Sequence, residues 1–164
     1  MIFGTVLLQM RQHDRALLEM DRAIALSPNY AECHALRGLV LGFMGETEAA
    51  VAAIETALRL NPRAPGYYHL MAGRAHLARR DFAAALAPLQ RAVGLAPAMT
   101  QIHVSLAVAL DGLGRRGGAE AEVAEVRRLN PTVGVAQIAK VLLYQDETVL
   151  DDQLTRLAAL GLPE

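Results

Sequence analysis

The stretch Ala57–Pro62, ALRLNP, occurs in related form four times along this chain of 164 residues. Its variants are AIALSP ending at Pro28, AVGLAP ending at Pro97 and VRRLNP ending at Pro131, so the four prolines lie 34, 35 and 34 residues apart. The chain has seven prolines, and four of them occupy this one position. A fixed period of this length is typical of a stack of small repeated units.

Small residues recur in step with these prolines. Gly38, Ala50 and Ala57 precede Pro62 with successive spacings of 12, 7 and 5 residues. Small side chains allow helix axes to approach to about 8–10 Å, so we expect these positions where helices cross. The equivalent sets are Gly4, Ala16 and Ala23 before Pro28, Gly73, Ala85 and Ala92 before Pro97, and Ala107, Ala119 and Val126 before Pro131.

Each unit has the pattern of two helices. In the second unit the apolar residues from Leu36 to Phe43 follow helical spacing, MGET interrupts them, and the spacing resumes from Ala50 to Leu58. Proline lacks a backbone N–H and disfavours helix in the residue before it, so Pro62 is expected to end the second helix. Pro88 lies inside such a helix, where we expect a lost hydrogen bond or a kink.

This pattern resembles the tetratricopeptide repeat, a unit of about 34 residues with small residues and a proline at matching positions. The resemblance implies an all-α fold, a right-handed α-solenoid of helix-turn-helix repeats with C-terminal capping helices. The expected repeats span 1–131, and a capping helix and a tail helix follow over 132–164. His34, His69 and His103 stand where the family often has an aromatic residue, and each ring is expected to fill an inter-helix slot. The repeat boundaries are 1–30 (incomplete), 31–64, 65–99 and 100–131.

The last fifth of the chain predicts two more helices. VGVAQIAKVLLY, residues 133–144, places its apolar residues on one face, which suits a helix that caps the last repeat. An amphipathic helix from Val149 to Leu160 follows, with Gly161 at its C-terminal cap. The simplest interpretation is a solubilising cap, since the end units of repeat arrays need one.

This tail is also similar to the one that closes the repeat region in some bacterial multidomain proteins. Those proteins carry a class III adenylate/guanylate cyclase domain or a winged-helix regulator domain ahead of the repeats. The resemblance implies that this chain is the C-terminal regulatory or scaffolding part of a bacterial signalling protein, with any catalytic domain upstream of Met1. The matching residues are Asp146, Leu154, Leu157, Gly161, Leu162, Pro163 and Glu164.

Composition excludes several classes of function. The net charge is −1 with no basic stripe, which argues against nucleic-acid binding. No apolar run reaches the roughly 18–20 residues of a membrane span, so we expect no membrane association. The use of a single cysteine favours a reducing compartment, and we expect a cytoplasmic location. The single Cys33 forms no internal disulfide and no zinc motif.

The sequence also offers no convincing catalytic or metal-binding group. The three repeat-equivalent histidines would lie on helices about 8–10 Å apart, too far to share one zinc ion. Cys33 and His34 are adjacent and do not face each other on a helix. GLGRRGG, residues 112–118, lacks the ending of a phosphate-binding loop. We therefore expect no catalytic residue, no metal, no cofactor and no enzymatic activity.

A concave face is the expected binding surface, because stacked helix pairs generate one. The family resemblance implies that the first helix of each unit lines it, and an apolar peptide or helix is the expected ligand. For the leucines, a groove position and a core position both remain open, whereas Arg74 is expected to face the groove because arginine is rarely buried unpaired. Replacing Tyr67 and Arg74 together by alanine should then weaken binding. The candidate groove residues are Thr5, Gln9, Glu32, Leu39, Phe43, Tyr67, Leu70, Arg74, Leu77, Gln101, Val108 and Asp111.

Two functions remain open. The first is the non-catalytic interaction module of a signalling protein described above, with a protein or peptide partner. The second is a free-standing adaptor that self-associates as a homo-oligomer through its N-terminal helix. The first unit begins part-way through its first helix and presents Ile2, Phe3 and Val6, whereas end units normally carry a polar outer face.

Overall fold

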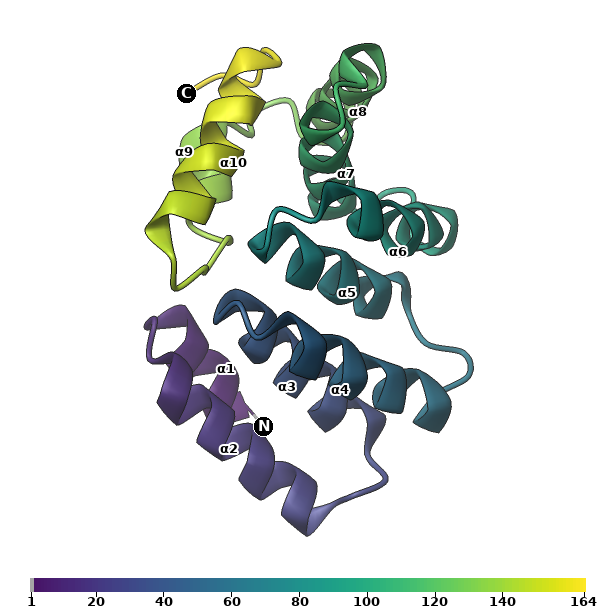
Figure 1. Cartoon of the computed structure of the whole chain (residues 1–164), viewed down its shortest axis with the longest axis vertical. Coiled ribbons are helices and arrows are strands. Elements are labelled where there is room, and N and C mark those ends of the chain that lie inside the picture. Colours follow the sequence, from purple (N-terminus) through teal and green to yellow (C-terminus); the bar gives the residue numbers. More distant parts are fainter. Residues whose placement is uncertain (1) are drawn as a thin grey trace.

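The computed structural model describes residues 2–164, which form ten α-helices and no strands. Helices α1 to α8 pair into four hairpins that stack into a curved, right-handed array (Figure 1). Two further helices, α9 and α10, lie on the inner side of the curve. The helices are α1 (Ile2–Gln9), α2 (His13–Leu26), α3 (Ala31–Phe43), α4 (Thr47–Leu60), α5 (Gly66–Ala78), α6 (Phe82–Leu95), α7 (Thr100–Gly112), α8 (Arg116–Leu129), α9 (Val135–Ala139) and α10 (Glu147–Ala159).

The turn inside every hairpin contains one residue in the left-handed backbone conformation. These residues are Arg11, Gly45, Arg80 and Gly114, with φ angles of 56°, 82°, 57° and 71°. They are repeat-equivalent, each lying seven residues after Gly4, Gly38, Gly73 or Ala107. Glycine adopts this conformation without steric cost, so the two arginines need a compensating role.

The small residues lie at helix crossings, as the sequence predicts. A Cβ atom on Gly38 would lie 2.5 Å from Ile54 Cγ1 and 2.9 Å from the carbonyl oxygen of Ala50. A Cβ atom on Gly73 would lie 2.5 Å from two side-chain atoms of Leu89. Both helix pairs therefore pack closely at these glycines, and at Gly38 the backbone oxygen of Ala50 leaves no room for a side chain.

Two of the three repeat-equivalent histidines link consecutive repeats. Nε2 of His34 lies 2.8 Å from the carbonyl oxygen of Pro28, and Nε2 of His103 lies 2.8 Å from that of Pro97. Both pairs are six residues apart in the sequence. The loop before His69 is one residue longer, and His69 instead lines an outer cleft of about 520 Å³.

Helix α6 continues through Pro88 and has 14 residues, the same length as α4. Pro88 therefore does not end the helix. Asp81 begins α6 as its N-cap, where its side chain accepts a hydrogen bond of 3.0 Å from the backbone N–H of Ala84.

The tail differs from the helix predicted over residues 133–144. Helix α9 covers only Val135–Ala139, and the chain then leaves helical conformation. Leu142, Leu143 and Tyr144 are consecutive and are only 0%, 5% and 1% exposed. Three consecutive side chains point in different directions from a helix, so a helix on a surface cannot bury them all. An irregular segment enclosed on several sides can do so.

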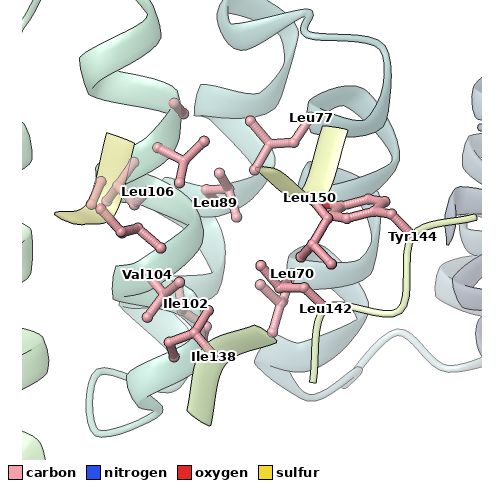
Figure 2. Packing of buried hydrophobic residues seen from close by; sticks show 14 of the residues in the cluster. Leu70, Leu77, Leu89, Ile102, Val104, Leu106, Ile138, Leu142, Tyr144 and Leu150 are labelled. Carbon is pink, nitrogen blue, oxygen red and sulfur yellow. The ribbon is translucent and has the colours of Figure 1, made fainter. Parts of the chain in front are cut away.

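The apolar core joins the tail to the inner helices. Leu70 and Leu77 of α5 belong to the same buried cluster as Leu142, Tyr144 and Leu150 of the tail (Figure 2). Helix α10 ends as the sequence predicts, with Gly161 in the left-handed region at φ 92°. Within residues 2–164, no helix has the length and apolar character needed to cross a membrane.

Candidate partner-binding face

The inner face of the array divides into two parts by exposure. The first helices of the repeats supply all twelve predicted groove residues, but the tail lies over part of them. We call the partly or fully exposed residues the open strip: Thr5, Gln9, Glu32, Leu39, Tyr67 and Gln101. We call the others, which are buried or ion-paired to the tail, the covered strip: Phe43, Leu70, Arg74, Leu77, Val108 and Asp111.

Tyr144 is the central tail residue over the covered strip. Its ring meets the ring of Phe43 edge to face, with 5.1 Å between centroids and an interplanar angle of 82°. Its hydroxyl donates to the carbonyl oxygen of Arg74 at 3.4 Å. The next residue, Gln145, donates its backbone N–H to the carbonyl oxygen of Phe43 at 2.8 Å. The segment is thus held by a buried aromatic ring and by a main-chain hydrogen bond.

The α1–α2 turn and the first residue of α2 hold the same segment from the opposite end of the array. Arg11 Nη1 donates to the carbonyl oxygen of Tyr144 at 3.2 Å. His13 is 6% exposed, and its Nε2 lies 2.6 Å from the carbonyl oxygen of Leu143, which it can reach only as a donor. The first repeat therefore contacts residues about 130 positions later in the sequence.

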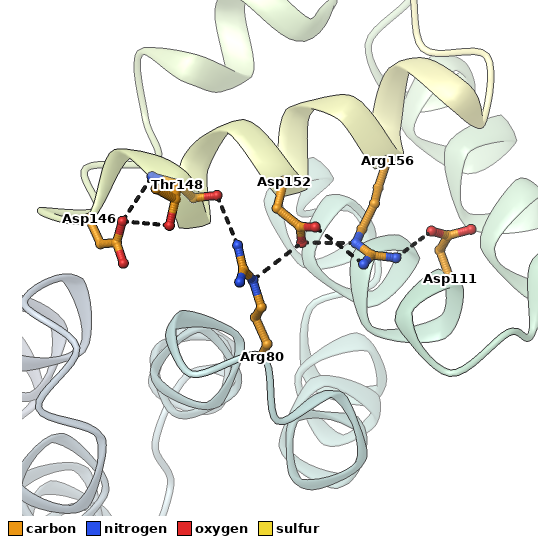
Figure 3. Close-up of polar contacts among 6 residues, drawn as sticks. All are labelled: Arg80, Asp111, Asp146, Thr148, Asp152 and Arg156. Carbon is orange, nitrogen blue, oxygen red and sulfur yellow. Dashed lines mark hydrogen bonds and ion pairs between the residues drawn. The ribbon is translucent and has the colours of Figure 1, made fainter.

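Charged side chains fix α10 to the array (Figure 3). Arg156 pairs with Asp111 of α7 and with Asp152 of its own helix, each at 2.9 Å. Its hydrogen bond to Asp152 raises the pKa of Arg156, so this side chain stays charged. Arg80, in the α5–α6 turn, donates to the carbonyl oxygen of Thr148 at 3.2 Å and lies 4.0 Å from Asp152.

Arg74 lies beneath the tail and not at the groove surface expected from the sequence. It is 6% exposed. Its Nε donates to Ser105 Oγ at 3.3 Å, and its Nη2 donates to Gln101 Oε1 at 3.5 Å. Within residues 2–164 no carboxylate lies within ion-pair distance of it, and burial lowers its pKa. The expectation that arginine would avoid unpaired burial is therefore wrong at this position.

The open strip contains a cluster of one carboxylate and two phenols. Glu32 accepts hydrogen bonds from the hydroxyls of Tyr67 at 2.5 Å and Tyr68 at 3.1 Å. The two rings meet edge to face, with 5.0 Å between centroids. Burial and the charge of Glu32 raise the pKa of Tyr68 to about 12 and raise that of Tyr67 as well. Tyr67 is half-buried and Tyr68 is buried, so Tyr67 is the phenol of this cluster that reaches the surface.

A cleft on the outer side was not predicted from the sequence. It has a volume of about 600 Å³ and is lined by residues of α4, α5 and the α5–α6 turn, including Thr47, His76 and an ion pair between Arg79 and Glu48. The pattern of apolar residues does not locate such a cleft, because its walls mix charged residues with Val51 and Ala52 on outer helix surfaces. Among residues 2–164, no three side chains of the metal-binding types lie close enough together to hold an ion.

The fold is a curved stack of helix hairpins whose first helices form the inner face. This is the architecture of helical-repeat scaffold proteins. The chain belongs to the tetratricopeptide repeat family, because the family model described as "Tetratricopeptide repeat" matches residues 36–98 and 70–133. These two matches together cover more than half of the chain.

Known proteins with related sequence or structure support this assignment. The chain is 35% identical over 88 residues to "Cell division cycle protein 27 homolog" of Caenorhabditis elegans, a match that spans 53% of this chain and only 11% of that protein. The fold is similar to TTC0263, a thermophilic TPR protein of Thermus thermophilus, with a TM-score of 0.73, 20% identity, and coverage of 96% of this chain and 86% of that one. It is also similar to YrrB, described as "a TPR protein with an unusual peptide-binding site", with a TM-score of 0.61, 22% identity, and coverage of 97% and 83%.

Proposed function

We propose that the chain is a non-catalytic protein–protein interaction module that binds a peptide segment of its partner on the inner face. The observation that supports this most directly is the open strip, which combines apolar Leu39 with the Glu32–Tyr67 hydrogen-bonded pair. Half-buried tyrosine supplies a large contact area at low entropic cost and is frequent at binding hot spots. The unusual peptide-binding site described for YrrB supports the same role by analogy of fold.

The setting we propose is the C-terminal regulatory or scaffolding region of a bacterial cytoplasmic signalling protein. The support is the resemblance of the tail to those proteins. The structure gives several of the matching residues structural roles: Asp146 caps α10, Leu157 is fully buried and Gly161 ends the helix. An immunoblot for this segment in its own cells tests the setting, since a band well above 17.6 kDa would support a longer chain and a band at that mass would contradict it.

The binding role is tested with a displayed peptide library selected against the full chain. A selected peptide should bind Tyr67→Ala at least ten-fold more weakly than the unaltered chain, with unchanged helical content by circular dichroism. Tyr30→Ala is the matched control, because Tyr30 is an exposed tyrosine outside the inner face. Arg74 is unsuitable for this test because its replacement would disturb the buried layer under the tail. Equal affinity for the Tyr67→Ala and Tyr30→Ala chains would contradict an inner-face site.

A second candidate is self-association through α1. Ile2, Phe3 and Val6 are 79%, 54% and 48% exposed, and they lie on the outer side of the first helix of the array. Clustered exposed apolar residues of this kind often mark an interface. Sedimentation velocity over a range of concentrations tests it: a dimer that Phe3→Glu abolishes supports the adaptor role, and a monomer throughout contradicts it.

A further inference from the structure

The tail segment Leu142–Gln145 is non-helical and is bound to the array as a peptide ligand would be. It contributes a buried ring at Tyr144 and donates the Gln145 N–H to the carbonyl oxygen of Phe43. Its own carbonyl groups accept from Arg11 and His13. Main-chain hydrogen bonds combined with side-chain burial are how peptide-binding grooves hold extended segments. The receptor surface comes from α3, α5 and the α1–α2 turn, elements remote from the tail in the sequence.

The two arginines in the left-handed turns indicate that the array is adapted to this segment. Units 2 and 4 have glycine at this position, as the backbone prefers, whereas units 1 and 3 have Arg11 and Arg80. A left-handed backbone conformation is sterically unfavourable for a non-glycine residue. Both arginines donate to tail carbonyl oxygens, Arg11 to that of Tyr144 and Arg80 to that of Thr148. The hydrogen bonds to the tail therefore compensate for the unfavourable backbone conformation of these two arginines.

The same interface also contains polar groups that are poorly satisfied. Gln153 of α10 is 2% exposed, and its Nε2 has no hydrogen-bond partner within the described residues. Arg74 is buried with two long hydrogen bonds to neutral oxygens and, among residues 2–164, no carboxylate partner. A buried donor without an acceptor and a buried cation without a counter-charge both lower the stability of the state that contains them. Both groups therefore lower the stability of the docked tail, which makes the tail easier for another ligand to displace.

From these observations we propose that the covered strip is a second peptide-binding groove and that the tail is its built-in competitor. The ligand is an extended segment of a partner protein with two aliphatic residues followed by an aromatic one, the chemistry of Leu142, Leu143 and Tyr144. Its binding displaces the tail and exposes α10. This inference rests on the proposed binding role but concerns a different part of the inner face from Tyr67.

The affinity of such a groove for an external peptide depends on how often the tail is undocked. A substitution that loosens the tail without altering the groove should therefore tighten peptide binding. Tyr144→Ala removes the buried ring of the tail and leaves Phe43 and Arg74 in place. Arg80→Gly removes a contact to α10 while giving the turn the residue that its backbone prefers, so this variant remains folded.

The test measures fluorescence anisotropy of a labelled peptide with the sequence of residues 140–147, Lys-Val-Leu-Leu-Tyr-Gln-Asp-Glu, titrated with the full chain. We expect Tyr144→Ala to bind at least ten-fold more tightly than the unaltered chain, and Arg80→Gly several-fold more tightly. Arg79→Ala, in the adjacent residue that pairs with Glu48 on the outer side, should bind as the unaltered chain does. A peptide with alanine in place of its tyrosine should not bind.

Two results would overturn the proposal. The first is equal affinity for the unaltered, Tyr144→Ala and Arg80→Gly chains when all retain their helical content. The second is a dimer of the unaltered chain that the peptide dissociates, since the occupant would then be the tail of a second copy. Neither result affects the binding role of the open strip, which is judged from library peptides and Tyr67→Ala.

Discussion

At the residue scale, the array depends on positions where only one kind of side chain fits. Gly38 shows this most clearly. A Cβ atom added there would lie 2.9 Å from the backbone oxygen of Ala50, which cannot move aside as a flexible side chain can. The repeat spacing alone predicts such positions, since the same small residue recurs where helices cross. The repeat spacing does not predict the left-handed residue in each turn, although glycine stands at that position in two of the four units, as Gly45 and Gly114.

Gly38→Ala should destabilise the chain by about 1–3 kcal/mol, because the added methyl group overpacks the α3–α4 crossing. Gly94→Ala is the matched control, since Gly94 is also helical and a Cβ atom there would meet no heavy atom within 4 Å. Alanine is the better helix former, so this control should stabilise the chain by about 0.5 kcal/mol. The midpoints of urea unfolding measure both effects. A Gly38→Ala midpoint at or above that of Gly94→Ala would contradict the close crossing.

The Glu32–Tyr68 pair predicts a loss of stability at high pH. The folded-state pKa of Tyr68 is about 12, above the ordinary tyrosine value of 10.0, so the stability linked to this phenol is fully present below pH 10 and is lost between pH 10 and 12. Lys140 is the only lysine, so the groups that titrate in this range are mainly the four tyrosines. Glu32→Gln should lower the pKa of Tyr68, which the near-ultraviolet absorbance of tyrosinate measures. An unchanged absorbance titration would show that Glu32 has no part in the shift.

At the scale of the elements, the helices of the four hairpins follow from the apolar spacing, whereas α9 does not. Val135, Ile138 and Leu142 have helical spacing, yet the chain leaves the helix after Ala139. The reason lies outside the segment: the inner face offers Phe43, Arg11 and His13 to residues 143–145, and these contacts outweigh the local preference. Local periodicity contains no information about a surface built by residues far earlier in the sequence.

The start of α10 is fixed by Asp146, whose side chain accepts from the backbone N–H of Thr148 at 2.8 Å and from its hydroxyl at 2.7 Å. Asp146→Ala should cost about 1 kcal/mol of helix stability, which corresponds to roughly five-fold faster amide hydrogen exchange in α10. Asp81→Ala at the N-cap of α6 is the control and should leave exchange in α10 unchanged. Equal acceleration of α10 exchange by both variants would mean that the tail opens only with the whole array.

At the scale of the whole molecule, the four repeats and their concave face could be predicted, but the occupation of that face could not. The family pattern implies that the first helix of each repeat lines the concave face. The pattern does not predict how exposed each side chain is. Arg74 shows the consequence, because the pattern places it on a first helix but does not predict its burial. The tail converts an open solenoid into a structure in which the first repeat and the tail share contacts.

Docking of the tail over the covered strip can be observed in solution by nuclear magnetic resonance. Nuclear Overhauser effects between the rings of Phe43 and Tyr144 should be strong in the full chain, since their centroids are 5.1 Å apart. In the same sample the amide of Gln145, which donates to the carbonyl oxygen of Phe43, should exchange slowly. Absent ring–ring effects together with exchange of that amide at the rate of an unfolded peptide would show that the groove is empty and contradict the account.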